Sequence, residues 1–294
     1  MRITDGMQYA AAIRALGANA EVLEGATRKA ASGIDVASPS DDPVRYSAGV
    51  ALSSRLAALE GRRKAVARGA GDLELTEAAL ADATDILVRA RELAVATADG
   101  GASTQARLAA AKEVALLRQA LGASANAHGT RGYLFAGTAT GTAPFDASGD
   151  FAGNDGLVQV EISEGVQLVT NIGGAAAFGG DPAGRDLFAD LESLETALLA
   201  DDPGAVRAHF DLLDQGREQL TVSRAEAGRR IERLQSAGDV IDTLTTGSRA
   251  ALAEQTEGEA NAVLARFTQA QAAYERSLAV TRQILSSSGT SSRF

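Results

Sequence analysis

The placement of proline restricts the fold of this chain more than any other feature of its sequence. The five prolines are Pro39, Pro43, Pro144, Pro182 and Pro203. A proline inside a helix removes a backbone hydrogen bond and clashes with the preceding turn, so long helices can form in residues 44–143 and 204–294, which hold none. Residues 129–184 contain 13 of the 31 glycines. The pattern predicts helical flanks around a middle segment of loops or β-strands.

Both flanks carry the period of amphipathic helices, with an apolar residue at every third or fourth position. Near the N-terminus these residues are Ile3, Met7, Ala10, Ile13, Leu16, Ala20 and Leu23. Near the C-terminus they are Ala260, Val263, Phe267, Ala270, Tyr274 and Leu278. Two further stripes are Leu80, Ala83, Leu87, Ala90 and Leu93, then Leu108, Ala111, Val114, Leu117 and Leu121. We expect the two end helices to pair antiparallel, as in a coiled coil.

A helix of about 40 residues would be roughly 60 Å long. Because this is longer than a compact domain requires, we expect such helices to pack against neighbouring molecules. The predicted assembly interface consists of Ile13, Leu16, Leu23, Val263, Phe267, Tyr274 and Leu278.

Local signals predict where several helices begin and end. The first helix should stop near Gly33, a left-handed cap residue. Asp42-Pro43 and Asp202-Pro203 each place a capping carboxylate before a proline at the first helical position. A further helix is expected over residues 186–199.

The middle segment changes from a helical period to alternation. Apolar and polar side chains alternate over residues 157–162, Glu164-Gly165 offers a turn, and residues 166–170 return as a partner strand. We predict a mainly α fold with a small β insert and a helical bundle.

The expected organisation has three parts. Residues 1–36 pair with 250–294 as an inner core, residues 37–137 form a bundle with 185–249, and residues 138–184 form a small outer β-domain. The polar residues from Ser286 onward are expected to be a mobile tail.

Charge and composition exclude several classes of function. The formal net charge of −10 would repel a phosphate backbone, which argues against a nucleic-acid partner. No window is apolar enough for membrane insertion, and the first residues lack the apolar stretch of a secretory signal peptide. The absence of cysteine removes disulfides, zinc–thiolate sites and thiol nucleophiles.

Catalytic motifs are also missing. The sequence has no phosphate-binding or dinucleotide-binding glycine motif, no nucleophile elbow and no metalloprotease motif. His128 and His209 lie far apart without a ligand pattern, and the capping role explains Asp41-Asp42 without a metal. The middle segment offers no acid–base pair and few aromatic residues for a ligand pocket. We expect no enzyme, no catalytic residues, no metal and no cofactor.

Several segments together resemble the flagellins and their hook-associated relatives. Residues 31–33 (Ala-Ser-Gly) and 38–43 (Ser-Pro-Ser-Asp-Asp-Pro) resemble the N-terminal segment of that family, as does Arg-Glu-Leu-Ala at 91–94. Gly-Tyr-Leu-Phe-Ala-Gly-Thr at 132–138 and Pro144-Phe145 resemble the members that join hook to filament, and Asn-Ile-Gly-Gly at 171–174 also fits them.

The resemblance implies a flagellin-like fold and a structural subunit of the extracellular bacterial flagellum that supports motility. It implies secretion through the flagellar type III apparatus with an export chaperone. The partners would be other hook-associated proteins, flagellin, and further copies of the chain in a ring at the hook–filament junction.

Two other hypotheses compete with this one. A filament-forming flagellin belongs to the same superfamily, although the segments at 132–138 and 41–43 oppose it. An unrelated helical adaptor or an enzyme is the third hypothesis.

Overall fold

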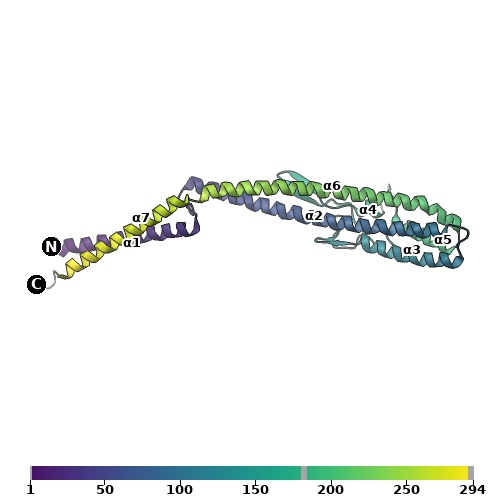
Figure 1. Ribbon diagram of the computed structural model, residues 1–294, viewed down its shortest axis with the longest axis horizontal. Coiled ribbons are helices and arrows are strands. Elements are labelled where there is room, and N and C mark those ends of the chain that lie inside the picture. Colours follow the sequence, from purple (N-terminus) through teal and green to yellow (C-terminus); the bar gives the residue numbers. More distant parts are fainter. Residues whose placement is uncertain (1, 180–183, 291–294) are drawn as a thin grey trace. The chain divides into compact units, whose positions relative to one another are not determined.

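The computed structural model describes residues 2–179 and 184–290. It is mainly helical with a small β insert, which confirms the fold class expected from the sequence (Figure 1). In chain order the elements are α1 (Arg2–Ser32), α2 (Pro43–Thr97), α3 (Thr104–Ala125), β1 (His128–Gly129), β2 (Gly132–Tyr133), β3 (Gln159–Ser163), β4 (Val166–Val169), α4 (Gly174–Phe178), α5 (Leu187–Leu199), α6 (Pro203–Thr256) and α7 (Ala260–Thr290).

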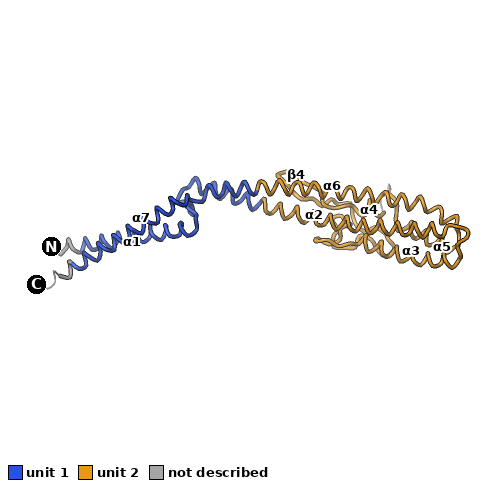
Figure 2. The backbone as a smooth tube through the Cα atoms, in the orientation of Figure 1, with its two compact units in different colours: residues 1–58, 245–294 blue, residues 59–244 orange. Residues whose placement is uncertain are grey.

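The chain divides into two compact units (Figure 2). Unit 1 is built from both ends of the chain, residues 1–58 and 245–294, and unit 2 from residues 59–244. The first part of α2 and the last part of α6 belong to unit 1, and the remainder of each belongs to unit 2. The three-part organisation expected from the sequence stays a prediction.

In unit 1, α1 and α7 lie side by side and run antiparallel (Figure 1). Helix α1 ends where predicted, because Gly33 has a φ of 73° and its N–H donates to the Lys29 carbonyl at 2.9 Å. That left-handed conformation favours glycine. The backbone of α7 is helical as far as Thr290, so the expected mobile tail is helical from Ser286 to that point, and residues 291–294 lie outside the described residues.

The two Asp-Pro helix starts are confirmed by their caps. Asp42 Oδ1 accepts two backbone N–H groups from the first turn of α2, each at 3.0 Å. Asp202 Oδ1 accepts two from the first turn of α6, at 2.8 and 3.0 Å. Asp186 caps α5 in the same way, as the helix expected at 186–199 requires.

The core of unit 2 follows a seven-residue repeat on α2 and α6. The buried residues, each exposed by 4% or less, are Leu59, Val66, Leu73, Leu80, Leu87 and Ala94 on α2, and Val206, Leu213, Leu220, Ala227, Leu234 and Ile241 on α6. A seven-residue repeat keeps one face of each helix toward its partner, as in left-handed coiled coils. Ion pairs Arg63–Asp242, Arg91–Asp214 and Arg224–Glu77 connect the two helices.

The β insert contains the hairpin expected from the alternating pattern. β3 pairs antiparallel with β4, with Val160 opposite Leu168. β3 begins at Gln159, later than predicted, because the N–H of Val158 donates to the Asn171 side chain at 2.9 Å. The short β1–β2 pair was not predicted, and residues 180–183 of the expected β-domain lie outside the described residues.

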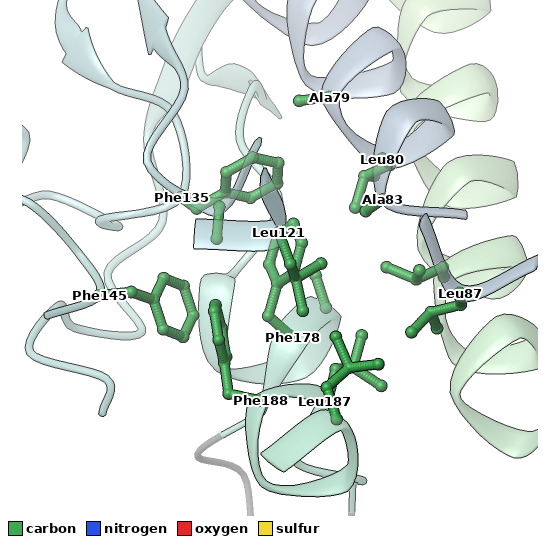
Figure 3. Close-up of a cluster of buried hydrophobic side chains, with 14 of the residues drawn as sticks. Ala79, Leu80, Ala83, Leu87, Leu121, Phe135, Phe145, Phe178, Leu187 and Phe188 are labelled. Carbon is green, nitrogen blue, oxygen red and sulfur yellow. The ribbon is translucent and has the colours of Figure 1, made fainter. Parts of the chain in front are cut away.

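Phenylalanines join the insert to the helices of unit 2 (Figure 3). The rings of Phe135 and Phe178 meet edge-on with centroids 4.9 Å apart, and Phe145 lies 5.3 Å from Phe188. Leu80 and Leu87 of α2 contribute to the same buried cluster (Figure 3). These aromatic side chains therefore serve packing between the insert and the helices.

Candidate assembly interface

The pairing of α1 with α7 partly buries the predicted interface residues. Val263 is the most buried of them, with 7% of its surface exposed, and Ile13 is the most open, at 43%. The remaining five are half-buried: Leu16, Leu23, Phe267, Tyr274 and Leu278. The chain thus brings them to one helix pair and buries Val263, but it leaves the other six partly open.

The rest of the helix pair exposes further apolar surface. None of residues 6–32 of α1 is fully buried. Met7 and Val22 on α1 expose 67% and 60% of their surface, and Leu264 and Val280 on α7 expose 57% and 54%. Burying one such side chain contributes about 1.5–3 kcal/mol. Packing of neighbouring molecules against the helix pair would therefore be favourable.

A groove of about 450 Å³ runs between α1 and α7. Its lining is mostly small or apolar, and comprises Val22, Gly25, Ala26, Lys29, Asp35, Val263, Arg266, Gln269, Ala270 and Ala273. Small residues allow close approach of another chain, whereas the charged residues gather near the end of α1 and the start of α7.

Those charged residues surround Asp35, whose side chain is 16% exposed. Arg266 of α7 donates to Asp35 Oδ1 at 2.9 Å. Lys29 of α1 lies 3.5 Å from the same oxygen, and Arg45 of α2 lies 3.6 Å from Oδ2. One carboxylate therefore contacts cations from three helices.

Asp41 organises the loop between α1 and α2. Its Oδ2 accepts the backbone N–H groups of Ala37 and Ser38 at 3.1 and 2.9 Å, and its Oδ1 accepts Lys29 Nζ at 2.7 Å. The hydrogen bond from Lys29, followed by that from the Ser38 hydroxyl, holds the pKa of Asp41 well below its usual range. The carboxylate is therefore a structural acceptor.

Neither histidine is part of a reactive cluster. His209, 6% exposed, bonds to Ser193 Oγ at 2.7 Å and to the Ala205 carbonyl at 2.9 Å. The ring of His128 lies against that of Tyr133, with centroids 3.9 Å apart and an interplanar angle of 40°. Within residues 2–179 and 184–290, no group of three or more His, Cys, Asp or Glu could hold a metal ion. No helix in those residues is long and apolar enough to cross a membrane.

Known proteins match this chain over most of its length. Residues 3–140 match the family described as the bacterial flagellin N-terminal helical region. Flagellar hook-associated protein 3 of Salmonella typhimurium is 28% identical over 272 residues, which cover 84% of this chain and 85% of that protein. The protein of the same name from Escherichia coli is 27% identical over 270 residues, with the same coverage. The chain is a homologue of flagellar hook-associated protein 3.

Solved structures related to hook-associated protein 3 share the fold. A flagellar hook-associated protein from Vibrio parahaemolyticus superimposes with a TM-score of 0.68 at 20% identity, covering 74% of this chain and all of that one. FlgL of Xanthomonas campestris gives 0.60 at 18% identity, covering 68% of this chain and 98% of its own. The flagellin-like fold expected from the sequence is thereby confirmed.

Sequence reasoning missed two features of this hook-associated protein 3 homologue. The seven-residue repeat of α6 was a detectable signal, because Val206, Leu213 and Leu220 already show it. The cations around Asp35 were not detectable in this way, since Arg266 lies 231 positions away.

Proposed function

We propose that the chain is a structural, non-enzymatic subunit of the bacterial flagellum that joins hook to filament and supports motility. The observation that carries this is the similarity to hook-associated protein 3 along 84% of the chain. The names of the curated relatives describe flagellar parts, which is consistent with a role that requires no catalysis.

The open α1–α7 pair supports an assembly role. We propose Ile13, Leu16, Leu23, Val263, Phe267, Tyr274 and Leu278 as the interface. All of them except Val263, which is already buried in the free chain, keep apolar surface for neighbours. In this proposal residues 1–36 and 250–294 form the inner core, 37–137 with 185–249 form the surrounding bundle, and 138–184 face outward.

The proposed setting is extracellular. The chain would be exported by the flagellar type III apparatus with the help of a chaperone, and would form a ring with further copies between other hook-associated proteins and flagellin. The formal charge of −10 argues against a nucleic-acid partner.

A filament-forming flagellin is the competing function. A flagellin needs matching upper and lower surfaces, because a heterologous contact that does not close generates an unlimited helical filament. A junction subunit needs a lower surface that fits a different protein, so self-matching should be disfavoured.

Electron microscopy of the purified chain separates these functions. Under salt conditions that polymerise a flagellin run in parallel, we expect monomers or small oligomers. Long filaments grown from this chain alone would overturn the junction proposal in favour of flagellin.

A further inference from the structure

We infer that Asp35 is the positioning residue of the α1–α7 pair. Its carboxylate attaches the end of α1 and the start of α7 to the start of α2 and, through Arg45, to the end of α6. The inference concerns unit 1 of the isolated chain and does not rest on the proposed function.

The side chain of Asp35 reaches three elements at once. Its oxygens contact Lys29 at the end of α1, Arg45 in the first turn of α2, and Arg266 near the start of α7. Arg45 also donates to the carbonyls of Glu254 and Glu257 at 3.3 and 3.1 Å, at the end of α6. Asp35 and its direct partners therefore connect all four helices of unit 1.

The backbone at Asp35 makes a second set of contacts between the two connecting loops. The N–H groups of Asp35 and Val36 both donate to the Thr256 carbonyl, at 2.8 and 3.1 Å, and Gly258 donates to Gly33 at 3.2 Å. A Cβ at Gly258 would lie 3.0 Å from Asp35 Cβ and 2.5 Å from Val263. The two loops thus pack directly against each other around this carboxylate.

Charge makes Asp35 difficult to replace. Lys29, Arg45 and Arg266 supply three positive charges to the ion pairs of this cluster, and Asp35 and Asp41 supply two negative charges. Without the Asp35 charge, Asp41 would still balance Lys29, but Arg45 and Arg266 would lose the carboxylate that both contact. The positive charges around the Asp35 position would then repel one another. The 16% exposure of Asp35 limits screening by water. Opening of the loops should relieve that repulsion.

The test measures amide hydrogen exchange of the purified full-length chain by NMR. Val36 and Gly258 report on the contact between the loops, and Leu213 in unit 2 reports on the rest of the fold. We expect Asp35→Asn to reduce protection at Val36 and Gly258 at least tenfold and to leave Leu213 unchanged. Asp35→Glu should restore part of the protection.

Two comparisons separate an electrostatic role from a general loss of structure. Glu24→Gln removes a charge from an exposed ion pair on α1 and should change nothing. In 1 M salt the screening length falls to about 3 Å, so the difference between wild type and Asp35→Asn should shrink, although by less than for a fully exposed ion pair.

Four results would overturn the inference: wild-type amides without protection, equal protection in wild type and Asp35→Asn, an effect unchanged in 1 M salt, or an equal loss at Leu213. These measurements need no flagellum. The expected exchange pattern in a chain that is absent from flagella would refute the proposed function and leave the role of Asp35 standing.

Discussion

Lys29 Nζ lies 2.7 Å from Asp41 Oδ1, and this ion pair joins the last turn of α1 to the loop that leads into α2. The same carboxylate accepts two backbone N–H groups of the loop. Lys29, with Ser38 after it, lowers the pKa of Asp41. The segment that resembles the flagellin family at residues 38–43 is therefore held in place by its own aspartate.

The lowered pKa predicts a pH dependence for this loop. An aspartate in an unfolded chain has a pKa of about 3.9. Because the folded-state pKa lies below that value, the stabilisation by Asp41 is complete above about pH 5 and is lost progressively as the pH falls toward the folded-state pKa. The protection of the Ala37 and Ser38 amides, taken relative to their intrinsic exchange rates at each pH, should fall in that window. Asp41→Asn should flatten the dependence at those two amides, and an unchanged profile would contradict this role.

Two glycines of α2 should respond oppositely to alanine. The space that an alanine Cβ would occupy at Gly61 is open, so Gly61→Ala should stabilise the helix by about 0.5–1 kcal/mol. At Gly69 a Cβ would lie 2.7 Å from Thr170 Cγ2 and 3.2 Å from Thr170 Cβ. Gly69→Ala should therefore destabilise unit 2, with overpacking costs of about 1–3 kcal/mol. Urea unfolding measures both changes, and an equal stabilisation by both substitutions would show that the insert does not press on α2.

A charge in the helix pair should block assembly without unfolding the chain. Leu16 and Phe267 are half-buried in the free chain, so Leu16→Asp or Phe267→Asp leaves the new carboxylate access to water there. In an assembled flagellum the same carboxylate would be buried without a partner, at a cost of several kcal/mol. We expect normal secretion and no incorporation. Leu116→Asp, at a position 64% exposed on α3, is the control for an added charge. Normal motility with either helix-pair variant would remove that residue from the interface.

The chain ends should be dynamic in the dilute monomer. Ordering a residue costs about 1–2 kcal/mol of backbone entropy, and α1 recovers little of this because none of residues 6–32 is fully buried. We expect fast amide exchange over roughly residues 1–35 and 255–294, slowing only where the loops meet at Asp35. Slow exchange throughout both ends would contradict this prediction.

Local features of the fold could be predicted from the sequence, because their causes lie within a few residues. The caps at Asp42 and Asp202 and the left-handed Gly33 depend only on the adjacent turn. The start of β3 was misplaced because Asn171, 13 positions from Val158, takes up its N–H.

The arrangement of the candidate interface was harder to predict, because its contacts join distant parts of the chain. The apolar period found Val263 and Leu16, but it could not show that Ile13 remains 43% exposed. The cations around Asp35 come from three helices. Their convergence depends on how α1, α2 and α7 meet in unit 1 and has no sequence pattern of its own.

Deletion of the gene tests the junction proposal most directly. A strain without this chain should build normal hooks, release flagellin into the medium and retain no filaments, and plasmid-borne wild type should restore the filaments. Filaments of normal length on the deletion strain, or the loss of filaments with no flagellin in the medium, would contradict the proposal.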